Sequence, residues 1–328
     1  MNILITGGTG FIGRHLMRAL IRQGFHCKCL TRGGSRVKNI AKLDNVTIVY
    51  GDITDKGSLQ ECMQGVEVVY HLAGQVGEWG VSDERFFAVN VEGTRNLLEA
   101  ASEAGVKHFI FCSTPGVQGK GHANASEELP YNPSQIYELT KAEAEKIVLA
   151  FNSEKAEALK VTIVRPDFVY GPGDLRRIPL YRVSKNRRFF LIGDGMALFH
   201  PTFIDDAVQA FCLLPNNPVS FGQIYNIAGP QTMTVKEYVQ TIAEALNVPL
   251  PRVKIPIAVG RVLALFFEAA SRINGKAPVL SLSKMDFLTK HHGSDISKAM
   301  AQLGYKPESD FAKGISITFQ WYRKENLL

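Results

Sequence analysis

The sequence predicts an α/β protein with a doubly wound parallel sheet, followed by a smaller C-terminal part. In the first half, short apolar runs alternate with stretches whose apolar residues recur at helical spacing. This alternation is typical of a parallel sheet with helices on both faces. After about Gly171 the elements become shorter and Pro and Gly more frequent. We therefore expect a first domain over 1–170 and a second over 171–328, some of whose elements return to the first.

Six segments have the length and apolar content of buried strands. They cover residues 2–6, 26–30, 46–50, 66–72, 108–112 and 161–165. The stretches between them carry helix-period residues, of which Ile12, Leu16 and Leu20 are examples. The order of elements therefore predicts a Rossmann-type sheet.

Composition narrows the function classes. The formal net charge is +6 over 328 residues, but Lys and Arg are scattered and partly matched by acids. We therefore expect a small anionic ligand and no nucleic-acid partner, because a phosphate backbone requires a basic stripe. The five cysteines are odd in number and lack the paired spacing of a zinc site, which predicts no metal centre and reduced thiols in the cytoplasm.

The opening segment "MNILITGGTGFIG" places glycines between the first strand and the first helix. Gly7, Gly10 and Gly13 permit a tight turn, close approach to a pyrophosphate, and close packing of the helix on the sheet. Phe11 and Ile12 then open the helix, whose N-terminal N–H groups bind anions. These five residues predict a dinucleotide site, and the alternative is an ordinary tight connection.

The end of the second strand indicates which dinucleotide binds. An acidic residue there would bind the adenosine ribose of NAD, but this chain has "CLTRGGSR". Arg32 puts a guanidinium at that place, with Ser35 and Arg36 nearby as donors for a 2′-phosphate. NADP is therefore predicted, and the alternative is that Arg32 is a solvated charge and the cofactor is NAD.

Two further strand ends lie at the same edge of the predicted sheet. Asp52 and Ile53 follow the third strand, and Leu72, Ala73 and Gly74 follow the fourth. Ligands bind at this edge in open α/β sheets. We therefore assign these residues to the cofactor site.

The segment "YELTK" places Tyr137 and Lys141 four residues apart, on one face of a helix. A nearby ammonium favours the phenolate and is expected to lower the pKa of Tyr137, as a proton donor or acceptor requires. Upstream, a buried strand ends in the hydroxyls of Ser113 and Thr114. These groups predict a hydride-transfer site, although the alternative of a helical surface pair remains open.

With these residues the chain resembles the extended short-chain dehydrogenases/reductases, of the NAD-dependent epimerase/dehydratase superfamily. Further motifs that carry the resemblance are "NVEGTRNLLEAA", "RPDFVYGPGD", "HPTFIDDAV" and "LGYKP", and they cover nearly the full chain. The resemblance implies that Tyr137 is the general acid/base, that Lys141 holds the nicotinamide ribose and tunes Tyr137, and that Thr114 orients the reacting oxygen. It also implies that Pro166, Phe168 and Val169 line the nicotinamide end of the cofactor site. Asn90 is assigned to the cofactor site, or alternatively to holding a turn or helix start.

The substrate is less well defined by the sequence. Family members that act on nucleotide sugars often carry an arginine before the "DD" pair, and this chain has Leu198, Phe199 and His200 there. Two alternatives are open for the arginines of the preceding segment. They bind a diphosphate, or they form a solvated face; these arginines are Arg176, Arg177, Arg182 and Arg187. We place His200 in the substrate pocket or in a structural role.

The stretch from 255 to 273 is apolar but interrupted by charges, so we expect no transmembrane segment. It predicts a buried helix or one that seeks an interface, including peripheral contact with a membrane. The chain resembles the 3β-hydroxysteroid dehydrogenase-like or dihydroflavonol reductase-like branch, in which this region helps cover a hydrophobic substrate. Gln75 and Trp79 are expected to form another wall of the pocket.

These observations predict an NADP-dependent oxidoreductase that interconverts a secondary alcohol and a ketone in a bulky, apolar, steroid-like or flavonoid-like substrate. The alternatives are a nucleotide-sugar 4-epimerase or dehydratase, and a non-catalytic dinucleotide sensor. The resemblance also implies a homodimer through helices that begin near Glu92 and Ser134, burying faces such as Leu97, Leu98 and Ala101.

Overall fold

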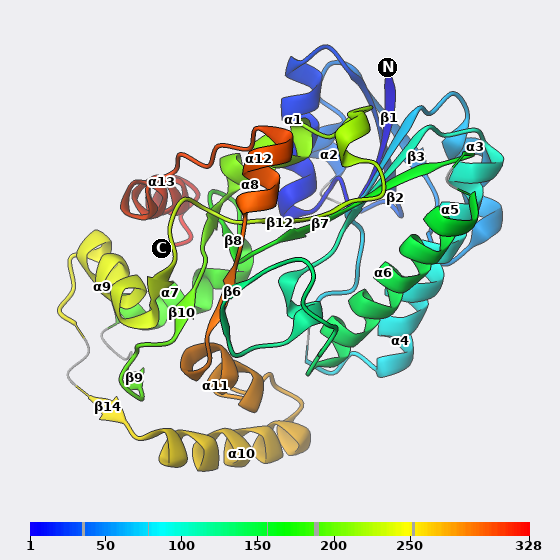
Figure 1. Ribbon diagram of the computed structural model, residues 1–328. Helices are drawn as coiled ribbons and strands as arrows, with labels where there is room; N and C mark the ends of the chain where they lie inside the picture. The colour runs from blue at the N-terminus through cyan, green and yellow to red at the C-terminus, as the bar shows by residue number, and fades with distance from the viewer. Residues whose placement is uncertain (35–36, 78, 156, 187–189, 251–252) are drawn as a thin grey trace.

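Seven parallel strands form the main sheet of the protein. The computed structural model describes residues 1–34, 37–77, 79–155, 157–186, 190–250 and 253–328, and over these the strand order is β12-β7-β5-β4-β1-β2-β3. The strands are β1 (Asn2–Thr6), β2 (His26–Thr31), β3 (Val46–Tyr50), β4 (Val68–His71), β5 (His108–Cys112), β7 (Lys160–Pro166) and β12 (Ile224–Ile227). The predicted doubly wound sheet is confirmed (Figure 1).

All six predicted strands are present, with ends that differ by at most two residues. The seventh, β12, comes from the C-terminal half and pairs with β7. The segment 224–227 is too short for its apolar pattern to stand out from the loops around it. Because β12 lies in the main sheet, the second half of the chain contributes to both parts, and the boundary at 170/171 stays a prediction.

Helices cover both faces of this sheet (Figure 1). One face carries α1 (Phe11–Arg22) and α8 (Ile204–Cys212), which pack on each other, and the other carries α3 (Gln60–Met63), α5 (Gly93–Glu103) and α6 (Ile136–Lys155). Side chains alternate along β1, so Ile3 and Ile5 join the first core and Leu4 joins the second. Short elements near these faces are α2 (Val37–Ile40), α4 (Asp83–Phe87), η1 (Lys56–Leu59), the π-helical turn η2 (Ala88–Glu92), η3 (Pro115–Gln118) and η5 (Pro218–Ser220).

The C-terminal half adds an aromatic core and three strands of a smaller sheet, whose fourth strand, β6, comes from the first half. Its four-stranded sheet contains β13 (Met233–Thr234), β10 (Leu198–Phe199), β15 (His292–Ser294) and β6 (His122–Ala125). Two strand pairs join β8 (Val169–Tyr170) to β11 (Thr202–Phe203) and β9 (Leu191–Ile192) to β14 (Lys254–Ile255). The helices of this half, besides α8, are η4 (Leu175–Arg177), α7 (Ile178–Lys185), α9 (Val235–Leu246), α10 (Ile257–Asn274), α11 (Leu282–Thr289), α12 (Ser297–Leu303) and α13 (Phe311–Lys324).

The order of strands reverses its direction at β1. From β1 the chain adds β2 and β3 on one side and then β4, β5, β7 and β12 on the other. The loops after β1 and β4 therefore diverge to opposite faces, and ligands bind at such a point in open α/β sheets. Every sequence-assigned cofactor residue between Gly7 and Gly74 follows a strand at this edge.

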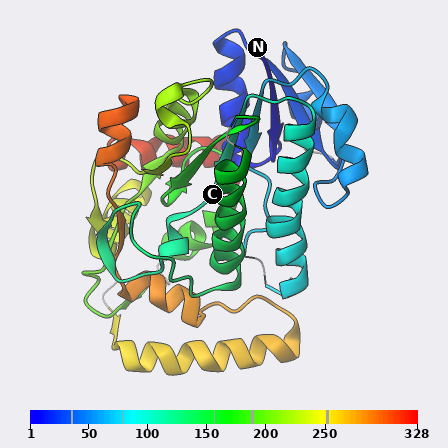
Figure 2. The same cartoon turned by 45° about the vertical axis from the view of Figure 1, so that its right-hand side comes forward.

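Helix α10 lies at the outside of the molecule, next to α11 (Figures 1 and 2). The alternative of a buried core helix is wrong, because its buried residues are small ones, Gly260, Ala264 and Ser271. Within the described residues, no helix is both long enough and apolar enough to cross a membrane.

The prediction that apolar residues of α5 form a dimer contact is wrong for the three residues named. Leu97, Leu98 and Ala101 are fully buried within the subunit, where they pack on the sheet. They are therefore unavailable to a second copy. Apolar positions at helical spacing on a sheet-covering helix usually face the sheet, and here they do so.

Candidate active site

The turn after β1 has the shape that a dinucleotide requires. Gly7 has φ +70°, and a Cβ atom there would lie 2.7 Å from the backbone nitrogen of Ala73. A Cβ on Gly13 would collide with the Gly7 carbonyl oxygen, so α1 packs directly on the turn. Gly10 caps α1 without a side chain, which leaves the first-turn N–H groups, including those of Phe11 and Ile12, for an anion. This cradle fits a pyrophosphate.

A buried polar chain fixes the end of β4 beside this turn. The Ala73 N–H donates to Thr6 Oγ1 (3.1 Å), and Thr6 Oγ1 lies 2.8 Å from His71 Nδ1. His71 Nε2 lies 3.0 Å from Thr94 Oγ1, which itself donates to the Asn90 carbonyl oxygen (2.6 Å). This pattern assigns the His71 proton to Nε2. Burial, with a further contribution from the charge of Lys141, holds the pKa of His71 well below its usual value.

Asn90 connects the loop after β4 to the helix that carries Tyr137. Its Oδ1 accepts from the Gln75 N–H (2.7 Å), and its Nδ2 donates to the Gln75 carbonyl (3.0 Å) and to Thr140 Oγ1 (3.0 Å). Asn90 lies in the π-helical turn η2, a distortion that is frequent at functional sites. All three of these bonds agree with the alternative that Asn90 holds a turn or a helix start. Contact of Asn90 with the cofactor stays a prediction.

The ends of β2 and β3 bring Arg32 and Asp52 together. Arg32 Nη1 lies 3.8 Å from Asp52 Oδ2, and the Arg32 side chain is 65% exposed. Burial pushes the pKa of Asp52 upward, but two hydrogen bonds from Thr54 and the charge of Arg32 hold it below its ordinary value. Ile53 is buried against Gly93 of α5, where a Cβ would collide with it. Ser35 and Arg36 lie outside the described residues.

The sequence-assigned catalytic residues lie at the ends of two neighbouring elements. Thr114 follows β5 and caps η3, where its Oγ1 accepts from the Gly116 N–H (3.3 Å). Tyr137 and Lys141 occupy successive turns at the start of α6. Lys141 is 3% exposed, and its Nζ lies 3.8 Å from the centroid of the Phe111 ring on β5. The buried lysine therefore lies against the strand that leads to Thr114.

The electrostatics of the pair differ from the expectation. Burial lowers the pKa of Lys141 to about 8, against smaller opposite effects of Cys112 and Glu145. Burial also raises the pKa of Tyr137, with Cys112 adding to the effect and Arg176 opposing it. The expected lowering of the Tyr137 pKa by Lys141 is wrong for this structure, because burial dominates and the ammonium lies over the Phe111 ring.

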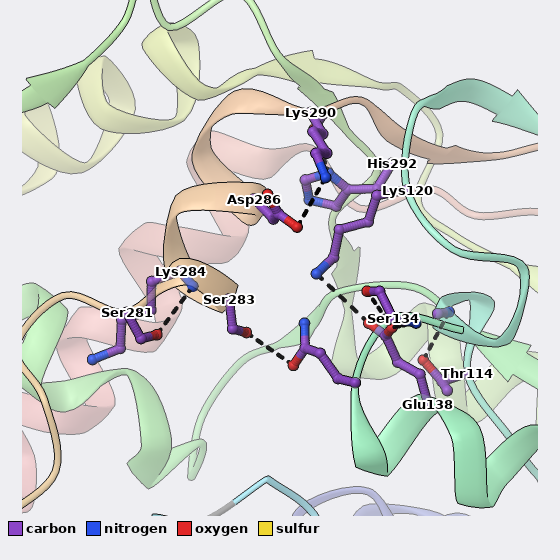
Figure 3. A network of polar contacts seen from close by, with 12 residues as sticks. Thr114, Lys120, Ser134, Glu138, Ser281, Ser283, Lys284, Asp286, Lys290 and His292 are labelled. Carbon is purple, nitrogen blue, oxygen red and sulfur yellow. Dashed lines mark hydrogen bonds and ion pairs between the residues drawn. The ribbon is translucent and has the colours of Figure 1, made fainter. Parts of the chain in front are cut away.

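Glu138, next to Tyr137, ties the start of α6 to the loop after β5 (Figure 3). Its Oε2 accepts from the Ser134 N–H and hydroxyl (2.9 Å each), and its Oε1 lies 3.6 Å from Lys120 Nζ. A Cβ on Gly116 would lie 2.9 Å from Glu138 Cγ, so this loop packs on the glutamate. Sequence reasoning missed Glu138 and Lys120, although Ser134 placed four residues before an acid at a helix start was a signal.

The nicotinamide-end residues lie where β7 meets the aromatic core. Pro166 ends β7 and Val169 begins β8, while Phe168 between them has φ +31°, a strained value for a side-chain-bearing residue. The Phe168 ring stacks on Phe287 (5.0 Å between centroids) and lies 3.6 Å from Arg177 Cζ. Its ring is therefore partly packed on the aromatic core, and contact of Phe168 with the cofactor stays a prediction.

The expected pocket residues Gln75, Trp79 and His200 lie on two different segments, the loop after β4 and the stretch between β10 and β11. His200 is buried, with Nδ1 3.0 Å from the Ser294 carbonyl and Nε2 2.8 Å from the Gly229 carbonyl, so it joins β15 to the loop after β12. Gln75 lies beside Asn90 on the loop after β4, and Trp79, 40% exposed, follows on the same loop. Both partners of the His200 ring are acceptors, so a neutral imidazole donates to one of them, and this placement between two carbonyls supports the structural alternative for His200.

A glycine cradle at the switch point of a parallel sheet, with a tyrosine and a buried lysine one helical turn apart, defines an enzyme of the extended short-chain dehydrogenase/reductase type. Residues 3–228 match the model of the NAD dependent epimerase/dehydratase family, and the chain belongs to this family. Dependence on NAD or NADP follows from that membership.

Curated relatives and a solved structure agree with this assignment. The chain is 31% identical to 3beta-hydroxysteroid-dehydrogenase/decarboxylase isoform 1 of Arabidopsis thaliana, over 96% of this chain and 78% of the relative. It is 30% identical to sterol demethylase protein B of Methylococcus capsulatus, over 100% of both chains. The crystal structure of gox2253 superposes with a TM-score of 0.83, at 27% identity and over 99% of each chain.

Proposed function

We propose that the protein is an NADP-dependent oxidoreductase that interconverts a secondary alcohol and a ketone on a bulky, apolar, sterol-like ring system. The observation that carries the proposal is the placement of Lys141, buried one helical turn from Tyr137 and against the strand that ends at Thr114. A buried cation is costly, and such perturbed groups concentrate at functional sites. The sterol-like substrate class is supported by the names of the two curated relatives.

Each residue of the site would have its own role in the reaction. The bound nicotinamide supplies or accepts the hydride. Tyr137 passes the proton at the substrate oxygen through its hydroxyl, and Thr114 Oγ1 donates a hydrogen bond that orients this oxygen. Lys141 holds the nicotinamide ribose through its ammonium group. Asn90 and Glu138 are positioning residues, because their bonds join the loops after β4 and β5 to α6.

NADP is proposed over NAD because of Arg32. The guanidinium follows β2, is mostly exposed, and has one carboxylate partner at 3.8 Å, so it is accessible to a 2′-phosphate. Guanidinium groups bind phosphates with paired hydrogen bonds, which a ribose hydroxyl does not match.

The nucleotide-sugar alternative requires cations that grip a diphosphate. Of the described arginines proposed for this, Arg176 and Arg177 pair with Asp174 at 3.1 and 3.0 Å, and Arg182 donates to the Leu327 carbonyl oxygen. Arg187 lies outside the described residues. Since these side chains already have partners, the oxidoreductase is favoured.

A net redox assay tests the proposal. The purified protein is incubated with NADP or NAD and with 3β-hydroxysteroids, 4-carboxysterols or UDP-sugars, and reduced cofactor is measured at 340 nm. We expect stoichiometric NADPH with a steroid or sterol. Isomerised UDP-sugar without net cofactor reduction would support the epimerase instead, and cofactor binding without turnover of any substrate would support the sensor.

A homodimer and a cytoplasmic location belong to the same proposal. The outer faces of α5 and α6 border an open surface hollow of about 350 Å³ lined by residues that include Arg95, Glu99, Ile147 and Phe151, and this hollow supports a contact between copies there. The five cysteines are free, which supports a reducing compartment. Light scattering at micromolar concentration distinguishes the dimer from a 36.2 kDa monomer.

A further inference from the structure

The outward face of α10 is apolar along its whole length. Val262 and Phe266 are each 66% exposed and Ile273 is 90% exposed, and Val259, Leu265 and Ala269 are exposed on the same side. At 100° per residue these side chains centre on the direction opposite to Gly260, Ala264 and Ser271, which face Met285 and Ile192. Figures 1 and 2 show the helix running along the outer edge of the molecule.

Basic side chains surround this apolar face and would attract an anionic surface. Arg261 and Arg272 are exposed on one flank, and Lys254 and Lys276 are exposed near the two ends of the helix. Glu268 is the acid of this helix and lies on the same flank as Arg261 and Arg272, where its carboxylate accepts the Leu282 N–H (2.8 Å) at the start of α11. The outward face therefore presents apolar side chains bordered by cations, and the one carboxylate of α10 on that border is hydrogen-bonded to the start of α11.

The size of the face argues against a second copy of the chain as its occupant. At 1.5 Å per residue the helix is about 27 Å long, and a strip ~10 Å wide covers roughly 300 Å². A stable dimer buries about 800 Å² on each partner. A lipid surface needs no such area, because insertion of a few apolar side chains and attraction of cations to headgroups act together.

We propose that α10 lies in the headgroup region of an anionic phospholipid bilayer, with Val262 and Phe266 inserted and Arg261 and Arg272 at the lipid phosphates. Long basic side chains reach from a partly inserted helix to the headgroups. The helix is oriented along the bilayer surface, since no described helix is suited to span it.

The same contact would place the active site near the bilayer. Helix α10 packs on α11, and Ser283 of α11 donates to Gln135 Oε1 (2.9 Å), two residues before Tyr137 (Figure 3). A sterol-like molecule leaving the bilayer would therefore meet α11 on its way to Tyr137. This consequence rests on the proposed function, whereas lipid binding itself does not.

Flotation of the full-length protein with vesicles tests the proposal without reference to activity. The vesicles are phosphatidylcholine alone, or phosphatidylcholine with 30% phosphatidylglycerol (~7:3). We expect flotation with the anionic vesicles, reduced by high salt. Val262→Gln with Phe266→Gln should weaken binding at least tenfold. Arg261→Gln with Arg272→Gln should weaken it about fivefold per arginine and flatten the salt dependence.

Met300→Gln is the matched control, because Met300 is a 50% exposed apolar residue on α12, away from α10, and its replacement should leave flotation unchanged. Thermal unfolding and cofactor binding verify that each variant is folded, and Phe266→Gln alone serves if the double variant unfolds. Absence of flotation of the original protein overturns the proposal. So does a dimer in light scattering that Val262→Gln with Phe266→Gln dissociates, because the face then belongs to a second copy.

Discussion

The cost of burying Lys141 predicts that removing it stabilises the protein while abolishing its activity. Lys141 is 3% exposed, and burial lowers its pKa from 10.5 to about 8. At ~1.36 kcal/mol per pKa unit, the buried ammonium costs about 3 kcal/mol at pH 7 relative to the unfolded chain. Methionine has a similar shape and no charge. We therefore expect Lys141→Met to raise the free energy of unfolding by up to about 3 kcal/mol at pH 7.

The pH dependence gives this prediction a definite sign. Between pH 8 and 10.5 the unfolded chain binds the lysine proton and the folded chain does not, so the stability of the original protein rises with pH in this window. The advantage of Lys141→Met should therefore shrink to about 1.4 kcal/mol at pH 9.5 and vanish above about pH 10.5. Below about pH 8 it should be constant.

Urea denaturation of both proteins at pH 7 and pH 9.5, followed by circular dichroism, measures the difference. Cofactor binding is titrated in parallel and should be weakened, because the lysine is assigned to the nicotinamide ribose. A Lys141→Met protein that is less stable at pH 7, or a difference that does not change with pH, would refute the reasoning from burial.

Three further substitutions test the site. Tyr137→Phe keeps the ring and removes the transferable proton, so steady-state turnover should fall roughly 10²- to 10⁴-fold with little change in cofactor affinity; near-original turnover would exclude the mechanism. Arg32→Ala should weaken NADP binding roughly tenfold to a hundredfold and leave NAD nearly unchanged in fluorescence titrations, and equal losses would contradict NADP preference. Gly13→Ala places a Cβ against the Gly7 carbonyl and should cost about 2–4 kcal/mol in urea denaturation, whereas Gly77→Ala, with open space around it, should be nearly neutral.

The parts of the site that the sequence predicted are those that depend on local geometry. The run of residues 2–6 and the glycines that follow it specify a strand, a turn and a helix without any distant contact, and the structure has all three. The spacing of Tyr137 and Lys141 likewise requires only that a helix form. Local patterns predict such features because each neighbour is fixed by the backbone itself.

Features that depend on distant partners were not predictable in this way. Nothing near Glu138 in the sequence indicates Lys120, and burial of Lys141 depends on strands and loops far along the chain. The expected lowering of the Tyr137 pKa was wrong for this reason: spacing placed the ammonium on the correct helix face but gave no information about the Phe111 ring beneath it.

The cofactor turn and the catalytic helix belong to one buried polar chain. The chain runs from the Ala73 N–H through Thr6, His71 and Thr94 to Asn90, and from Asn90 to Thr140 on α6, between Tyr137 and Lys141. Its members join β1, β4, η2, α5 and α6, so a shift of the sheet edge is transmitted to the helix that carries the acid/base. Since each group in the chain is hydrogen-bonded, breaking one link leaves a buried donor or acceptor unpaired, which costs about 1–3 kcal/mol. This rigidity holds Lys141 in a position where its own charge is unfavourable. The burial that makes the lysine costly for stability is therefore the same burial that places it in the active site.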